Sequence, residues 1–348
     1  MTDWIPAFDP HRVFVEPWTV NVSLKLWIVV MGFLVLTTCG WVGQYLILRR
    51  MALMGDAISH SILPGLAGSF LIGAWWAGNG SASGEGGARG SVPMFLGALV
   101  AAVITTVLIE WIHRRSRVKQ DAAMGTVFSA LFALGVVLIT VFADHVDLDA
   151  DCVLHGEIGF VPFEDYFKVG GREWMPVPVA RMLVVSLLTA AWIGMFYKEL
   201  LVSSFDPGLA TSLGISAQRV HFLLMAWLAV VIVSAFESVG AILVVAALIV
   251  PGATATLLSS NLPRIFLWIT LHAAVSALAG LHLAVWLDCS IAGAMVVAGC
   301  ALFVLAWAAS SWSQWRARRL MATGAPPEPE ERTLTAPPTP SSPGRSAA

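Results

Sequence analysis

The sequence predicts an all-α protein, a polytopic bundle of about nine transmembrane helices, or eight. Hydrophobic residues make up 57% of the 348 positions and charged residues only 12%. Soluble domains carry about 25% charged residues, so this composition indicates an integral membrane protein. The net charge is −2, so basic residues are not in excess and the charge gives no indication of a nucleic-acid partner.

The expected membrane spans share a length of about 20 residues and few charges between their ends. In chain order they cover residues 24–48, 52–76, 92–112, 121–143, 180–197, 219–236, 239–260, 264–286 and 289–312. The weakest boundary is the turn at 234–240, which leaves almost no loop between two spans. One of those two is therefore expected to be short or re-entrant.

The placement of basic residues orients the bundle. Lys and Arg residues occur in alternate connections, beginning with Arg49 and Arg50, and the positive-inside rule makes that side cytoplasmic. The amino terminus, residues 1–23, is then extracytoplasmic, and it lacks the features of a signal peptide. The carboxyl terminus is cytoplasmic. Its proline-rich tail, residues 313–348, cannot bury a core and is expected to be disordered.

The first candidate site lies in the second span. Asp56 and His60 stand at i and i+4, which places them on one helical face where both could touch one cation. Ionisable groups are costly in a bilayer and are usually kept there for function. Pro64 and Gly65 then break the helix, as in the discontinuous spans of transporters. Carboxylate and imidazole suit zinc, manganese or ferrous iron. The alternative is that Asp56 caps the helix and His60 bonds to a neighbour.

The second candidate is Glu237, at the tight turn before residues 240–255. That span carries its own Pro-Gly pair, Pro251 and Gly252, and two interrupted spans indicate a substrate path. The alternative is an ordinary carboxylate at the outer interface. Because Asp56 is expected nearer the cytoplasm, entrance and exit points along one path fit better than one shared site.

The third candidate is a short cytoplasmic helix over residues 206–214. Asp206 suits its N-cap, Pro207 its first position and Gly214 its end. The helix has little apolar surface to bury by itself, which favours docking into the groove of a partner. The alternative is a plain amphipathic connector. The residues expected to make the docking contact are Phe205, Asp206, Pro207, Gly208, Leu213 and Gly214.

An acidic outer segment, residues 147–157, carries several carboxylates together with His155 and Glu157 and could attract a metal ion. The commoner meaning of such a segment is a solvated acidic loop, and a further alternative is contact with an extracytoplasmic partner. Two motifs are absent from the sequence. Without G-x-x-x-x-G-K-[ST] the chain has no phosphate-binding loop, so any ATP that drives it must bind to another polypeptide. Without H-E-x-x-H the commonest zinc-protease interpretation falls away.

Four segments together resemble the integral membrane permeases of ATP-binding-cassette (ABC) importers for zinc, manganese and iron. They are residues 49–60, 153–158, 205–215 and 239–255, and the likeness runs from about residue 24 to 312. It implies an architecture like that of the vitamin B12 importer (type II) in a bacterial inner membrane. Residues 163–178 are longer than usual for the family, and the proline-rich tail is extra.

The resemblance also implies partners. These are a second permease copy or a sister permease, cytoplasmic ATPase subunits that bind the ATP, and an extracytoplasmic metal-binding protein. Residues 206–214 match the coupling helix that docks on the ATPase, and Asp56 and His60 match residues lining the path. Glu237 falls where family members vary. The metal is a transported substrate, and no cofactor is expected to stay bound.

Two other classes compete with this hypothesis. One is a proton-coupled secondary metal carrier, in which the ionisable groups relay protons. The other is a membrane-embedded metalloenzyme built on Asp56, His60 and Glu237, but no nucleophile motif accompanies them. The sequence favours a non-enzymatic transport subunit and leaves the choice among zinc, manganese and iron open.

Overall fold

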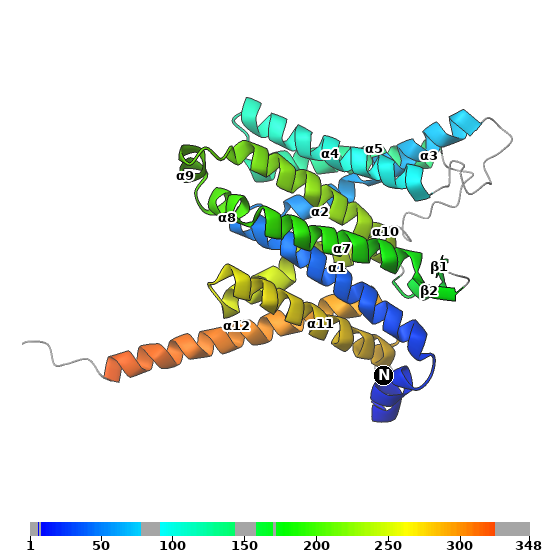
Figure 1. Cartoon of the computed structure of the whole chain (residues 1–348), viewed down its shortest axis with the longest axis vertical. Coiled ribbons are helices and arrows are strands. Elements are labelled where there is room, and N and C mark those ends of the chain that lie inside the picture. The colour runs from blue at the N-terminus through cyan, green and yellow to red at the C-terminus, as the bar shows by residue number, and fades with distance from the viewer. Residues whose placement is uncertain (1–5, 7, 78–90, 143–157, 170–171, 324–348) are drawn as a thin grey trace, which may run out of the picture. The chain divides into compact units, whose positions relative to one another are not determined.

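The computed structural model describes residues 6, 8–77, 91–142, 158–169 and 172–323 and confirms the predicted all-α class (Figure 1). Seven of its described helices are long and apolar enough to cross a membrane. The helices are α1 Val22–Leu48, α2 Met54–Ser61, α3 Leu63–Ala77, α4 Ser91–Arg115, α5 Gln120–Phe142, α7 Val177–Met195, α8 Tyr197–Phe205, α9 Pro207–Ser212, α10 Ala217–Leu258, α11 Leu262–Leu287 and α12 Ile291–Thr323.

The chain divides into two units, Met1–Trp307 and Ala308–Ala348. The described part of the second unit is the end of α12, where the rings of Trp312 and Trp315 lie 5.6 Å apart and the Arg319 guanidinium lies 3.7 Å from the Trp315 ring. Helix α12 thus continues past residue 312, where the sequence places the end of the last span. The tail beyond Thr323 lies outside the described residues.

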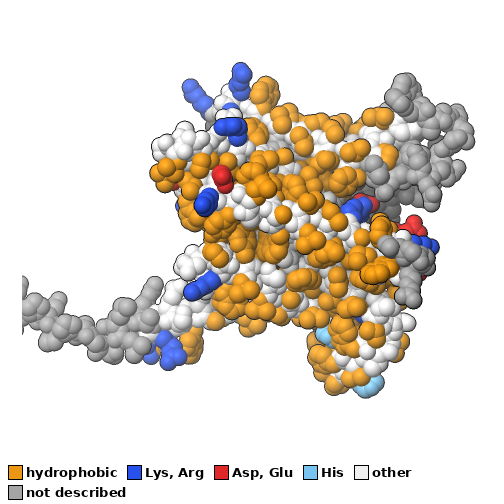
Figure 2. All heavy atoms as spheres, in the orientation of Figure 1, with side chains coloured by type: hydrophobic (Ala, Val, Ile, Leu, Met, Phe, Trp, Pro, Cys, Tyr) orange, Lys and Arg blue, Asp and Glu red, His pale blue; other side chains and the backbone are white. Residues whose placement is uncertain are grey.

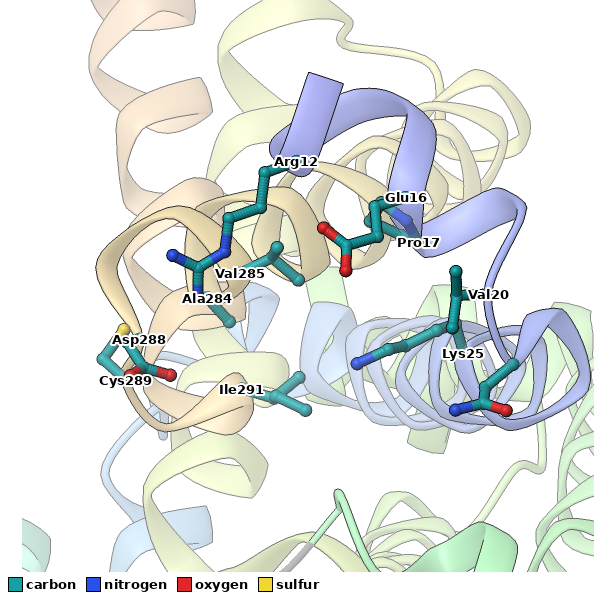
Figure 3. A pocket seen from close by; sticks show the side chains of 11 residues that line it. Arg12, Glu16, Pro17, Val20, Lys25, Ala284, Val285, Asp288, Cys289 and Ile291 are labelled. Atoms are coloured by element: carbon teal, nitrogen blue, oxygen red, sulfur yellow. The ribbon is translucent and has the colours of Figure 1, made fainter. Parts of the chain in front are cut away.

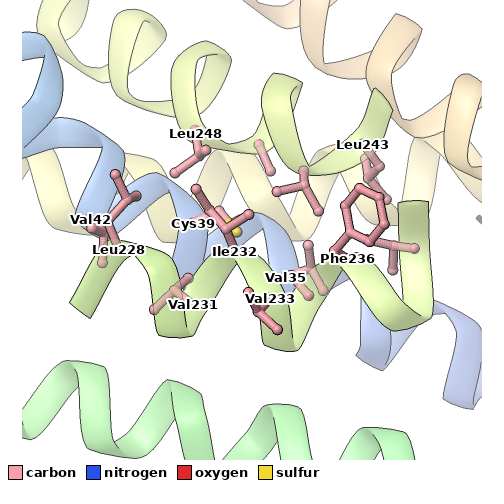
Figure 4. Close-up of a cluster of buried hydrophobic side chains, with 14 of the residues drawn as sticks. Val35, Cys39, Val42, Leu228, Val231, Ile232, Val233, Phe236, Leu243 and Leu248 are labelled. Atoms are coloured by element: carbon pink, nitrogen blue, oxygen red, sulfur yellow. The ribbon is translucent and has the colours of Figure 1, made fainter. Parts of the chain in front are cut away.

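Helix α10 contains two of the expected spans, because its backbone turns at Gly240 with φ 74° and ψ 172°. Figure 4 shows that the chain reverses there, with Phe236 and Leu243 at one end of the close-up and Leu228 and Leu248 at the other. Helix α1 packs against α10, and its buried Val35, Cys39 and Val42 belong to the same apolar cluster. The helices touch closely, because a Cβ on Gly43 would overlap with the Leu248 carbonyl.

The expected span 52–76 is split into α2 and α3, each shorter than the length a membrane span requires. The interruption is confined to Ile62, just ahead of the predicted Pro64 and Gly65, and the Ile62 backbone keeps helical angles of φ −67° and ψ −31°. Pro64 has no N–H to donate to the preceding turn and sits instead near the start of α3, where proline is tolerated. Gly65 allows α3 to approach α4 at Gly97, since a side chain on either glycine would meet the other's carbonyl oxygen.

Two small elements add to the bundle. The extra stretch at 163–178 contains an antiparallel hairpin of β1 Tyr166–Val169 and β2 Arg172–Pro176, preceded by a 3-10 turn, η4 Val161–Phe163. Near the amino terminus, η1 His11–Val15 lies against α11 and η2 Glu16–Trp18 lies against α1. His282 fixes them, because its Nδ1 donates to the Val13 carbonyl at 2.8 Å and its Nε2 accepts from the Trp18 indole at 3.4 Å.

Charge is distributed unevenly along the bundle. The face seen in Figure 2 is apolar across its middle, with Lys and Arg side chains toward the end where α8 and α9 lie in Figure 1. The hairpin and the N-terminal turns lie at the opposite end. An apolar band between charged ends is the pattern of a protein that crosses a bilayer, and the basic end is the one predicted to be cytoplasmic.

Candidate metal path

Asp56 and His60 meet on one face of α2. The His60 Nε2 atom lies 3.3 Å from Asp56 Oδ1, and the two side chains are 29% and 38% exposed. The His60 ring also contacts Phe128 and Phe132 of α5, each at 5.8 Å between centroids. A carboxylate and an imidazole side by side, partly open and supported by aromatic rings, can both bind one divalent cation.

The other face of α2 is packed tightly against neighbouring helices. Ala57 and Ile58 are buried, and a Cβ on Gly55 would overlap with the Leu248 side chain of α10. Ser61 accepts a hydrogen bond of 2.7 Å from Thr105 of α4. This packing fixes the rotation of the helix and so directs Asp56 and His60 away from the core.

Glu237 lies elsewhere, paired with Arg181 of α7 at 2.8 Å between Oε2 and Nη1. Both line a cavity of about 420 Å³, together with Ser238 and the loop carboxylates Glu164 and Asp165. The cavity extends to Ile62 and Leu66, on either side of the start of α3. It therefore reaches from Glu237 to Ile62, two residues after His60. Arg181 could not be found from the sequence, because its pairing with Glu237 joins two distant helices.

Asp56, His60 and Glu237 do not form one cluster. In the described part of the chain, no three His, Cys, Asp or Glu side chains come close enough together to hold a metal ion. The acidic segment 147–157, with His155 and Glu157, lies outside the described residues. The geometry therefore offers a two-residue site on α2 and a separate carboxylate beside the cavity.

The break predicted at Pro251 and Gly252 is wrong. Both residues are buried inside the continuous second half of α10. Helix α1 packs closely there, since a Cβ on Gly40 would lie 3.2 Å from the Pro251 ring and one on Gly252 would lie 2.8 Å from Ile47. Pro251 has no N–H and so leaves one backbone hydrogen bond of the helix unmade. The packing of α1 supports the helix at that point. The actual break in α10 is at Gly240.

The predicted short helix is present as α9, and its caps are formed as the sequence indicates. The Asp206 carboxylate accepts from the backbone N–H groups of Gly208 at 2.9 Å and Leu209 at 3.0 Å. At the other end Gly214 has φ 81°, and its N–H donates to the Thr211 carbonyl while the N–H of Ile215 donates to that of Ala210. This is a Schellman ending. Three apolar side chains in and beside this helix are at least half exposed: Phe205, Leu209 and Leu213.

A polar cluster that the sequence analysis missed surrounds Arg49, just after α1. Arg49 donates to Ser203 Oγ at 2.9 Å and to Ser204 Oγ at 3.1 Å, both on α8. Its Nη1 lies 3.3 Å from His221 Nδ1, and His221 Nε2 lies 3.4 Å from Glu110 Oε2. Burial lowers the pKa of Arg49 from its ordinary value. The only sequence signal was a charge placed directly at the end of an apolar run.

A second cavity, of about 380 Å³, lies between the N-terminal turns and the connection from α11 to α12 (Figure 3). Its lining mixes Arg12 and Lys25 with Glu16 and Asp288. None of the predicted site residues lines it. The cavity lined by α3, α4, α7 and α10 is therefore the better candidate for a cation path.

The chain is similar to known membrane permeases over most of its length. Residues 22–310 match the model of the ABC 3 transport family. The chain is 40% identical over 273 residues to the manganese transport system membrane protein MntD of Bacillus subtilis, covering 78% of this chain and 88% of MntD. It is 38% identical over 281 residues to the zinc transport system membrane protein TroD of Treponema pallidum, covering 80% and 72%.

A solved structure shares the fold. PsaBC from Streptococcus pneumoniae, in complex with a Fab, matches with a TM-score of 0.66 and 29% identity, covering 85% of this chain and 94% of that one. The family match spans most of the chain and both relatives exceed a third in identity. The chain therefore belongs to the ABC 3 transport family of membrane permeases.

Proposed function

We propose that this chain is the transmembrane permease subunit of an ATP-driven importer of divalent metal ions, with manganese, zinc and ferrous iron as candidate substrates. The observation that carries the proposal is the Asp56–His60 pair, a carboxylate and an imidazole 3.3 Å apart on the short helix α2. The relatives are named for manganese and zinc transport, and both metals accept this ligand pair.

In this mechanism the permease binds and releases metal but makes and breaks no covalent bond. Carboxylates around the outer cavity, including Glu237, attract the cation from an extracytoplasmic binding protein. Asp56 and His60 then hold the ion transiently. Two protein ligands suit this task, because water completes the coordination and a closed cage would not release the metal.

ATP acts through another chain. The sequence has no phosphate-binding loop, and the exposed apolar residues of α9 provide a docking surface for a cytoplasmic ATPase. A second permease, identical or related, would complete the path in a bacterial inner membrane. In this arrangement the amino terminus lies outside and the carboxyl terminus lies in the cytoplasm.

The test is to purify the tagged chain from its native membrane in mild detergent and to identify what accompanies it. An ATPase subunit and a metal-binding protein are expected, and the complex in liposomes should accumulate radioactive manganese or zinc only when ATP is supplied. If the purified chain alone transported metal when given only a proton gradient, the proton-coupled carrier would replace this proposal. Competition among manganese, zinc and ferrous iron in the same assay assigns the metal.

A further inference from the structure

The Arg49 cluster lies between the docking helix and the metal ligands. Helix α8 ends at Phe205 and α9 begins at Pro207, so the two are separated only by the capping residue Asp206. Ser203 and Ser204, in the last turn of α8, are both buried. A displacement of α9 by a partner would therefore act within four residues of these two hydroxyls.

Arg49 holds both hydroxyls with one planar side chain. Its Nη2 donates to Ser203 and its Nε to Ser204, at 2.9 and 3.1 Å. The guanidinium has five N–H donors in a rigid fork, so two simultaneous bonds fix its orientation as well as its position. Lysine has no such fork and could not reproduce both contacts with the same geometry.

The connection from Arg49 to α2 is short, and hydrogen bonds fix its conformation. Arg50 takes the left-handed conformation with φ 59°, and the N–H of Met51 donates to the Leu46 carbonyl at 2.8 Å. Met51 is buried, and its own carbonyl accepts from the N–H of Met54 at 3.0 Å, where α2 begins. Only four residues, fixed by these hydrogen bonds, thus separate Arg49 from the helix that carries Asp56 and His60.

A further contact joins Arg49 to α10 and, through His221, to α4. His221, near the start of α10, approaches its Nη1 and also contacts Glu110 of α4. Glu110 is 8% exposed and forms an ion pair with Arg114. The guanidinium thus contacts α8 directly through two serines and α10 through His221, and a side chain held by several groups favours discrete positions over gradual drift.

We propose that Arg49 is the positioning residue that transmits movement of the docking helix α9 to the metal-binding helix α2. This inference rests on the proposed function, because it assumes that an ATPase acts on α9. Arg49 itself touches no metal; it sets where Asp56 and His60 stand in each state of the transport cycle.

The experiment uses the complete transporter in liposomes and compares Arg49→Ala, Arg49→Lys, Ser203→Ala with Ser204→Ala, and the combination of Arg49→Ala with both serine changes. Arg50→Ala is the matched control, because Arg50 is the adjacent arginine, is exposed, and forms no side-chain hydrogen bond or ion pair within the described part of the chain. Two quantities are measured: metal ions transported per ATP hydrolysed, and amide hydrogen exchange over residues 51–61 with and without ATP.

For Arg49→Ala we expect the transport-to-hydrolysis ratio to fall by at least about fivefold, the lower end of ordinary coupling between sites. ATP should also cease to change exchange in residues 51–61. Arg49→Lys should give an intermediate transport-to-hydrolysis ratio, and the two serine changes together should lower the ratio as much as Arg49→Ala does. The combined variant should have the same ratio as Arg49→Ala, because all these changes remove one contact. Arg50→Ala should match the wild type.

Two results would overturn the inference: a wild-type ratio and ATP-dependent exchange in Arg49→Ala, or losses that multiply in the combined variant. If Arg49→Ala fails to assemble, the smaller serine changes decide the same question. Failure of the proposed function looks different, because then the wild type itself shows no ATP-dependent transport.

Discussion

At the scale of single residues, the pair of Asp56 and His60 makes the sharpest prediction. Replacing either by Ala should lower metal uptake by at least about tenfold, the scale on which even supporting groups of metal sites act. Uptake of radioactive manganese and zinc in cells measures this. Both variants should still assemble with their partners, because the two side chains are partly exposed and not part of the core.

The control for this prediction is His113→Ala. His113 is an exposed histidine at the end of α4, hydrogen-bonded only to the nearby Val118 carbonyl among the contacts described for it. Its removal should leave uptake unchanged. Normal uptake in both Asp56→Ala and His60→Ala would remove these residues from the path, whatever the rest of the transporter does.

Gly240 makes a prediction about stability. Its φ of 74° and ψ of 172° belong to a region that is essentially restricted to glycine. Gly240→Ala should therefore cost about 1–3 kcal/mol and lower the temperature of thermal unfolding in detergent. The matched change is Gly125→Ala inside α5, where an added Cβ meets nothing. That substitution should be neutral or stabilising, because alanine favours the helix.

If Gly240→Ala unfolds at the wild-type temperature, the reversal of α10 does not depend on this one conformation. Intrinsic tryptophan fluorescence follows both variants without added label, since the chain contains 15 tryptophans.

At the scale of elements, the cap of α9 links local stability to coupling. Asp206→Ala removes the acceptor for two backbone N–H groups and should weaken the helix by about 1 kcal/mol. Because α9 has only six residues, that loss should fray it and lower the number of metal ions transported per ATP hydrolysed. Asp206→Asn keeps an equivalent cap and should keep the wild-type ratio. A wild-type ratio in Asp206→Ala would show that the cap does not matter for docking.

Local signals account for what the sequence could predict at this scale. The i, i+4 spacing brought Asp56 and His60 together, and the residues flanking α9 gave its caps, because both depend only on neighbours along the chain. The break predicted at Pro251 was wrong, because Gly40 and Ile47 of α1 pack against the helix there. A contact between separate helices cannot be anticipated from neighbours along the chain. The same reason hid Arg49 with Ser203, and Arg181 with Glu237, since each pair joins separate helices.

At the scale of the whole molecule, the distribution of charge predicts the orientation in the membrane. Cys289 lies at the connection between α11 and α12 and is exposed, whereas Ser212 is exposed at the end of α9. Starting from a variant in which the four cysteines are replaced by Ser, restoring Cys289 should allow labelling by an impermeant maleimide in intact spheroplasts. Ser212→Cys should be labelled only after lysis. The reverse pattern would invert the orientation.

The reversal at Gly240 also bears on how the protein enters the membrane. Two apolar helices joined at one glycine have almost no hydrophilic loop to translocate, so Glu237 and Ser238 are the main polar groups that must cross. Helix α7 is synthesised before α10, so Arg181 is already in place as a counter-ion when Glu237 arrives. The pair that lines the cavity in the finished protein thus also lowers the cost of inserting α10 as a single helical hairpin during biogenesis.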